Sequence, residues 1–118
     1  MTSRPTARTR KIAALNDAFR QSIIDGKPTG ETYLTAALAA HGEPFFKRAS
    51  TAILRFNAFT SDIDPHGTRE WMRVNIDGIV VWAKIDYNDK ANPGFAADDP
   101  SDAATTTRVI TLMLPEDH

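Results

Sequence analysis

The chain has 118 residues, which suits one domain with its own hydrophobic core and is too short for two ordinary domains. Its formal net charge of −1 gives no overall field toward nucleic acid or membranes, so any such binding must come from a local patch. The absence of cysteine excludes disulfides, thiolate metal sites and thiol catalysis. No apolar run is long enough to span a bilayer and no apolar signal segment follows the basic N-terminus, so we expect a cytoplasmic protein without a membrane partner.

Residues 1–7 are polar and contain a proline, which predicts a flexible tail ahead of one α+β domain at residues 8–118. Apolar residues then recur at helical spacing, which predicts an amphipathic helix with a polar face turned away from the core. The predicted core residues are Ile12, Leu15, Phe19 and Ile23, and the predicted outward-facing residues are Asn16, Asp17, Arg20 and Gln21. Gly26 and Pro28 end this helix, and β-forming residues at 32–35 predict a short strand.

A second helix is predicted to begin at Pro44, because proline is well tolerated at the first helical position. Its apolar face comprises Phe45, Ala49, Ala52, Ile53, Phe56 and Phe59.

Beyond this helix the apolar period changes to that of strands. Residues 72–76 alternate apolar and polar, Asp77-Gly78 is typical of a type I′ turn, and residues 79–87 form the returning strand. Residues 88–105 are predicted to be a loop. In residues 109–114 both the odd and the even positions are apolar, which predicts a central strand buried on both faces. The element order predicts an α+β fold in which a small antiparallel sheet of three to four strands carries two helices on one face.

Four blocks of the sequence invite comparison with known proteins. They are Ala-Leu-Asn-Asp-Ala-Phe-Arg at 14–20, Asp-Ile-Asp-Pro-His-Gly at 62–67, Trp-Ala-Lys-Ile-Asp-Tyr at 82–87, and Thr-Arg-Val-Ile-Thr-Leu-Met-Leu at 107–114. Together they resemble a small uncharacterised bacterial family that is frequent on proteobacterial plasmids and prophages. The resemblance implies a mobile-element setting and supplies no catalytic residue. That family joins Trp directly to Lys-Ile-Asp-Tyr and has Tyr in place of His66, so Ala83 is an insertion here and predicts a β-bulge.

Asp62, Asp64 and His66 form the sharpest chemical pattern in the sequence, with three oxygen or nitrogen ligands close together along one loop. Carboxylates suit Mg²⁺, Ca²⁺ or Mn²⁺, and a histidine favours a transition metal. In the competing interpretation, the two aspartates accept backbone hydrogen bonds in turns before Pro65 and Gly67.

Basic residues suggest a second candidate surface, a patch that could meet phosphates or an acidic protein. Positive charge at the start of the first helix opposes the helix dipole, so this end either frays or awaits an anion. The alternative is a solvated helix face. The residues of this predicted basic patch are Arg8, Arg10, Lys11, Lys47, Arg48 and Arg55.

Aromatic and acidic residues suggest a third surface, for a protein partner. Trp71 and Trp82 lie on opposite strands of the predicted hairpin, and we expect each to cover one face of the sheet. Trp82 falls on the polar parity of its strand, so it is either an interface anchor or a core residue beneath a helix. The long loop offers Phe95 for docking and Asp98, Asp99 and Asp102 as mimics of phosphate. His118 is the terminal residue and is expected to be disordered.

We therefore expect a non-catalytic binding or accessory protein, because the sequence has no phosphate loop, nucleophile elbow or metal-binding histidine pair. The mobile-element resemblance implies an inhibitor or modulator of a host defence or nucleic-acid-handling complex. Two alternatives stay open, namely a small metal-dependent enzyme using Asp62, Asp64 and His66, and a weak nucleic-acid binder through the basic first helix. The expected partner is another protein, and no cofactor is expected apart from a divalent metal at the Asp62 loop.

Overall fold

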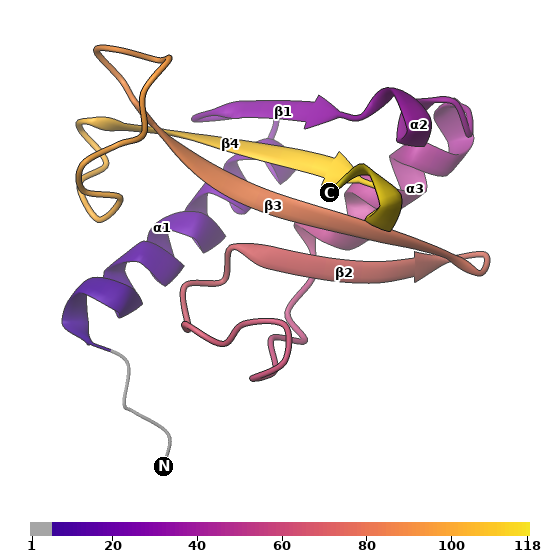
Figure 1. Ribbon diagram of the computed structural model, residues 1–118, viewed down its shortest axis with the longest axis horizontal. Helices are drawn as coiled ribbons and strands as arrows, with labels where there is room; N and C mark the ends of the chain where they lie inside the picture. Colours follow the sequence, from indigo (N-terminus) through magenta and orange to yellow (C-terminus); the bar gives the residue numbers. More distant parts are fainter. Residues whose placement is uncertain (1–5) are drawn as a thin grey trace.

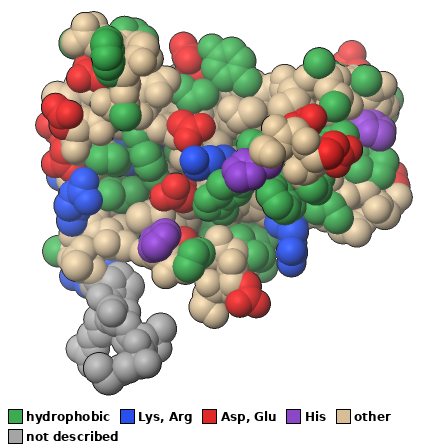
Figure 2. Space-filling view, in the orientation of Figure 1, with side chains coloured by type: hydrophobic (Ala, Val, Ile, Leu, Met, Phe, Trp, Pro, Cys, Tyr) green, Lys and Arg blue, Asp and Glu red, His purple; other side chains and the backbone are tan. Residues whose placement is uncertain are grey.

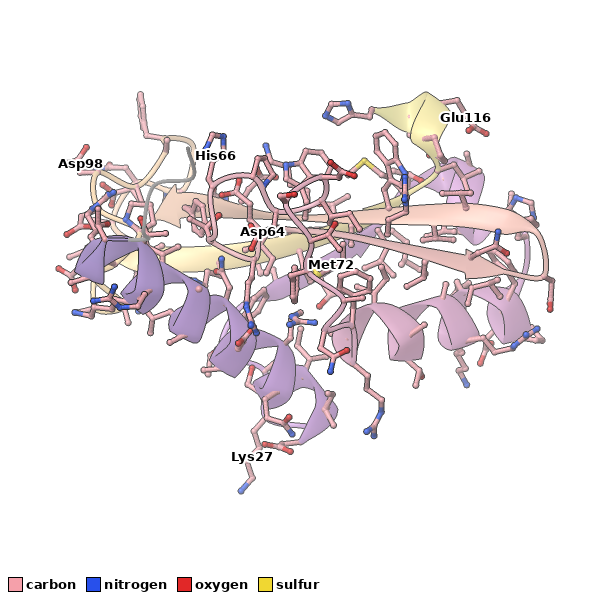
Figure 3. The ribbon with its side chains drawn as sticks, turned by 90° about the horizontal axis from the view of Figure 1, so that it is seen from below. Lys27, Asp64, His66, Met72, Asp98 and Glu116 are labelled. Atoms are coloured by element: carbon pink, nitrogen blue, oxygen red, sulfur yellow. The ribbon has the colours of Figure 1, made fainter. Side chains whose placement is uncertain are left out.

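Two layers, a sheet and the helices on one of its faces, make up residues 6–118, which the computed structural model describes (Figure 1). In these residues the four strands form one open sheet in the order β1-β4-β3-β2. The elements in chain order are α1 (Ala7–Ile24), β1 (Glu31–Leu34), α2 (Ala36–Ala39), α3 (Glu43–Leu54), β2 (Trp71–Ile76), β3 (Ile79–Asp89), β4 (Thr106–Met113) and the 3-10 helix η1 (Pro115–Asp117). Figure 3 shows the helices α1 and α3 on one side of the sheet and η1 on the other. The predicted α+β fold is confirmed.

The N-terminal tail is ordered closer to the start of the chain than expected. Helix α1 begins at Ala7, and the Thr6 side chain caps it by accepting a hydrogen bond from the Thr9 N–H at 3.0 Å. Residues 1–5, the rest of the predicted tail, lie outside the described residues. No helix within residues 6–118 combines the length and the apolar character that crossing a lipid bilayer requires.

The strand pairing is antiparallel at β2–β3 and β3–β4, as predicted, but β1 runs parallel to β4. Parallel neighbours need a long crossover connection, and here α2, α3 and the β2–β3 hairpin supply it. The turn of that hairpin has positive φ at both Asp77 (53°) and Gly78 (86°), as a type I′ turn requires.

β4 lies at the centre of the sheet. This confirms the prediction of a central strand, which was made from the apolar residues on both of its faces. Ile110 and Leu112 face the helices, while Val109 and Met113 face the opposite side, and all four are buried. The predicted bulge at Ala83 is absent, because β3 pairs without interruption with both β2 and β4 at this position. Ala83 is fully buried in the core, where its small side chain fits beneath the helical layer.

Helix α3 ends at Leu54, earlier than the predicted apolar face that ran to Phe59. The guanidinium of Arg20 caps this end, because Nη1 donates to the carbonyl oxygens of Ile53 and Phe56 at 3.1 and 2.7 Å. A cation at this position satisfies carbonyls that have no partner inside the helix and complements the helix dipole. In the segment after the helix, the rings of Phe56 and Phe59 pack edge to face, with their centroids 4.9 Å apart.

Candidate functional site

Two polar residues of α1 that were predicted to face outward, Asn16 and Arg20, are buried, with 0% and 5% of their surface exposed. The prediction was wrong because both side chains have specific partners beneath the helix. The amide nitrogen of Asn16 donates to the Thr68 carbonyl and the Tyr87 hydroxyl, both at 2.9 Å. Its oxygen accepts from Arg108 Nε at 2.7 Å. These hydrogen bonds offset the free-energy cost of burying the amide and fix the spacing of its neighbours.

A second set of bonds ties the segment before β2 to α1. Asp17 accepts from Arg20 at 3.0 Å and from Arg69 at 2.9 Å, so one carboxylate holds two guanidinium groups. Both cations lie over the ring of Phe59, at 5.2 and 5.0 Å from its centroid. This cluster fixes the path of residues 57–70 across the end of the sheet.

Tyr87, Asn16 and Arg108 contact one another and form what we call the buried cluster. Burial raises the pKa of the Tyr87 hydroxyl to about 12, while the hydrogen bond from Asn16 opposes the shift. Arg108 lies over the Tyr87 ring at 5.2 Å, and burial lowers the pKa of this guanidinium. The hydroxyl therefore acts as a neutral hydrogen-bonding group and not as a base.

The Asp62, Asp64 and His66 side chains do not form a ligand set. Within residues 6–118, no group of three or more His, Asp or Glu side chains could hold a metal ion. Asp64 instead accepts a hydrogen bond from the Arg69 N–H at 3.0 Å, which is the turn role of the competing interpretation. In Figure 3 the labelled Asp64 and His66 side chains lie apart and do not point toward one another.

The predicted basic patch is divided between two ends of the molecule. Arg8, Arg10 and Lys11 lie at the start of α1, whereas Lys47 and Arg48 lie on α3 and Arg55 at its C-cap, toward the opposite side of Figure 1. Arg8 already pairs with Asp99 at 3.3 Å. The two parts therefore cannot meet one small ligand together.

The α3 part of the patch lines a shallow hollow with a volume of about 450 Å³ beside the end of β2. Lys47 pairs with Glu43, and Arg48 pairs with Asp77 of the hairpin turn. Arg55 makes no described ion pair, but most of the charge in this hollow is already balanced. Its residues are Lys47, Arg48, Thr51, Ala52, Arg55 and Ile76.

The long loop brings the predicted acidic residues together, but two of them already accept hydrogen bonds from other residues of the loop. Asp99 accepts from the Ser101 hydroxyl at 2.6 Å, and the Ser101 bonds lower the pKa of this carboxyl. Asp102 accepts from the Ala104 N–H at 3.0 Å, as in an Asx turn. Asp98 makes no described bond, and Phe95 is the most exposed large apolar residue described, at 73%. The docking role predicted for Phe95 and Asp98 stays a prediction.

The two tryptophans lie on opposite strands of the hairpin, as predicted, and both cover the same face of the sheet. Trp71 pairs with Lys84 and Arg73 pairs with Trp82, so these four side chains share the face opposite to the helices. The indole rings meet edge to face, with centroids 6.0 Å apart. His118 was expected to be disordered, but its ring lies against both indoles, with centroid distances of 5.1 Å to Trp71 and 5.8 Å to Trp82.

These rings line a surface depression of about 370 Å³, which we call the aromatic hollow. Figure 2 looks onto this face and shows hydrophobic side chains gathered over β2 and β3 beside a histidine. Trp82 Nε1 is buried and has no hydrogen-bond partner among the described residues. The hollow comprises Asp62, Ile63, Pro65, Trp71, Met72, Arg73, Trp82 and His118.

Strand β2, which borders the aromatic hollow, is an edge of the sheet. The Ile85 N–H donates to the Glu70 carbonyl at 2.9 Å, so hydrogen-bonded pairs alternate along β2 from that position. The N–H and C=O groups of Trp71, Arg73 and Asn75 therefore point away from β3. No described backbone bond uses them. A row of free peptide groups thus runs beside the hollow.

Comparison with known proteins adds a family to this geometry. Residues 34–117 match the family described as "Protein of unknown function (DUF3768)". The chain belongs to this family. The matched region includes all four strands except the first three residues of β1, together with the whole aromatic hollow apart from His118. The comparisons with curated proteins and with solved structures found no match.

Sequence reasoning missed several residues that shape the sites of this DUF3768 member. Arg73 and His118 join the aromatic hollow, and Arg108 joins the buried cluster. The alternation of residues 72–76 already placed Arg73 on the polar face of its strand, and counting back from the Asp77-Gly78 turn gives its pairing with Trp82. Nothing in the sequence indicated that His118 folds back or that Arg108 is buried.

Proposed function

We propose that this protein is a non-catalytic binding protein that takes up an extended, acidic segment of another protein along β2. The segment adds as a fifth strand to the sheet, and one of its apolar side chains enters the aromatic hollow. The observation that carries the proposal is the free β2 edge, whose unpaired backbone groups lie next to two tryptophans. Strand addition of this kind takes affinity from main-chain hydrogen bonds and specificity from side-chain pockets.

The charge on β2 supports an acidic partner. Arg73 is exposed and forms no described ion pair, and its neighbour Lys84 already pairs with Asp86 at 3.2 Å. A carboxylate opposite Arg73 on an added strand would therefore gain a cross-strand ion pair. The same arginine disfavours a second copy of this chain, because antiparallel pairing of two β2 edges in the register that sets Trp71 against Asn75 also sets Arg73 against Arg73.

The rings of the hollow support an apolar anchor. Trp71, Trp82 and His118 present ring surface from two strands and from the C-terminal turn. Tryptophan is enriched among the residues that carry most of the binding energy of interfaces. Residues on an added strand point alternately to the two faces, so every second side chain of the segment lies over the hollow.

Selection from a random peptide library displayed on phage tests this proposal without a known partner. We expect the selected peptides to carry an acidic residue two positions from an apolar residue, because both must lie on the face of Arg73 and the hollow, and to shift the amide NMR signals of Trp71, Arg73 and Asn75. Arg73→Glu should weaken their binding about tenfold or more, as expected for loss of a charged contact. Arg55→Glu, which reverses another exposed arginine without a described ion pair, is the matched control and should bind as the parent does.

A pair of substitutions at Asn75 isolates the backbone contribution. Asn75→Pro removes an N–H that faces the free edge and is not used in the β2–β3 ladder, whereas Asn75→Ala keeps it. Peptide binding should be lost in the proline variant and kept in the alanine variant. Peptides without acidic residues, or equal binding to the proline and alanine variants, would contradict strand addition at β2.

The other functions expected from the sequence stay predictions. The host defence or nucleic-acid-handling partner is supported by the mobile-element resemblance alone, and the acidic β2 ligand does not depend on it. A metal-dependent activity lacks a ligand set among residues 6–118. Nucleic-acid binding would have to use the basic residues at the start of α1 without those on α3.

A further inference from the structure

On the helix side of the sheet, a pocket of about 340 Å³ opens between α1, the start of β4 and the long loop. Its floor contains the buried residues Phe19 and Arg108, and its rim carries the exposed residues Ala18, Lys90 and Ala103. Leu15 adds a further apolar wall. We call this the α1 pocket. It lies on the opposite side of the sheet from the aromatic hollow.

Arg108 is a buried cation without a carboxylate partner. It is 6% exposed and donates from Nε to Asn16 and from Nη2 to the Pro100 carbonyl, which are both neutral acceptors. Its third neighbour is the face of the Tyr87 ring. Nη1 makes no hydrogen bond with the described residues, and no described carboxylate pairs with this guanidinium.

A charge taken out of water costs several kcal/mol unless an opposite charge or a full set of hydrogen bonds compensates it. In Arg108 that compensation is incomplete, and the guanidinium lines a pocket large enough for a small molecule. Lys90 adds a second positive charge at the rim. Its described bond goes to the Ala103 carbonyl at 3.4 Å, and it forms no described ion pair.

We propose that the α1 pocket binds a small organic anion, whose carboxylate lies against Arg108 and Lys90 and whose apolar body packs on Leu15, Ala18 and Phe19. The planar guanidinium suits a carboxylate, because its donors match the two oxygens. The apolar wall selects a ligand with a hydrocarbon part over a bare inorganic anion.

The surroundings exclude a large polyanion. Asp98, Asp99 and Asp102 line the neighbouring hollow on the other side of Lys90. Their charges would repel an extended phosphate backbone, while a single small carboxylate reaches past them to Arg108. The site is also independent of β2, so the α1 pocket and strand addition can each succeed or fail alone.

Titration with hexanoate, followed by amide NMR and by the melting temperature, tests the α1 pocket. Hexanoate should shift the signals of Leu15, Phe19 and Arg108 and raise the melting temperature as its concentration increases. Hexanol, which has the same chain without the charge, and inorganic phosphate, which has charge without the chain, should each bind at least about tenfold more weakly. If hexanol binds as tightly as hexanoate, or phosphate does, the proposal is overturned.

Substitutions at the rim avoid disturbing the buried cluster. Lys90→Ala should weaken hexanoate binding about fivefold or more, while Lys27→Ala, which alters another exposed lysine outside the pocket, should leave it unchanged. Ala18→Phe fills the pocket from an exposed helical position and should abolish binding. Unchanged binding in both Lys90→Ala and Ala18→Phe would refute the assignment, as would the absence of binding to the parent protein.

Discussion

Replacing Asn16 by leucine is expected to destabilise the protein far more than a surface asparagine substitution does. Leucine has the same number of side-chain heavy atoms in a similar branched arrangement but no hydrogen-bonding group, so the variant removes the bonds, and its bulkier branch adds to the loss of stability. Two buried groups then lose their partner, the Thr68 carbonyl and the charged Arg108 Nε. Tyr87 keeps a longer contact to Glu70 at 3.5 Å, so we do not count it as unsatisfied.

The magnitude follows from these two groups. A buried neutral acceptor left without a partner costs about 1–2 kcal/mol, and a charged donor costs about 2–3 kcal/mol. The sum, about 3–5 kcal/mol, compares with a total stability of about 6–18 kcal/mol for a chain of this length. Asn16→Leu should therefore remain folded at room temperature with a clearly lower unfolding midpoint.

Urea unfolding followed by far-UV circular dichroism and tryptophan fluorescence measures this loss. The midpoint should fall without a change in the dependence of the free energy on urea, because the folded surface stays the same. Asn57→Leu alters an exposed asparagine after α3 and should change stability by no more than about 0.5 kcal/mol. A loss below about 1 kcal/mol for Asn16→Leu would refute the account of the buried cluster.

Two further predictions test the packing beside the cluster and its ionisation. Gly30→Ala should lower the free energy of unfolding by about 1–3 kcal/mol, because the added Cβ would lie 2.2 Å from the Arg108 carbonyl oxygen. Gly94→Ala is the control, because a Cβ at that position meets nothing within 4 Å. Equal losses of stability in the two variants would contradict the close approach at Gly30. Stability should fall as the pH rises from 10 toward 12, because the folded state keeps the Tyr87 proton that the unfolded chain releases near 10.0. Tyr87→Phe should lessen this fall, and an unchanged slope by urea unfolding at each pH would argue against a raised pKa.

Predictions from the sequence were correct where they depended only on residues close together along the chain. The Asp77-Gly78 turn follows from the positive φ that a type I′ turn needs at both positions, and both residues adopt it. The two apolar parities of residues 109–114 indicated a strand buried on both faces, and β4 is flanked by β1 and β3. Each inference used neighbours within a few residues, where backbone sterics and periodicity decide the outcome.

The sequence misled where a polar side chain has a distant partner. Asn16 and Arg20 were placed on the outward face because polar residues are mostly exposed. Their partners in the folded chain include Arg108, 92 residues from Asn16, and the Ile53 carbonyl, 33 residues from Arg20. Periodicity within one helix carries no information about such acceptors, so only the packed structure reveals that these residues belong to the interior.

By itself, then, the sequence determined the kinds of element, the hairpin and the central strand of this DUF3768 member. Only the tertiary structure decided that β1 runs parallel to β4, that the tryptophans share a face with His118, and that Arg108 lies buried in the α1 pocket. The reason is that element type depends on local backbone preferences and apolar periodicity. Strand direction, shared faces and pockets depend on which distant segments meet, and that is settled by the packing of the whole chain.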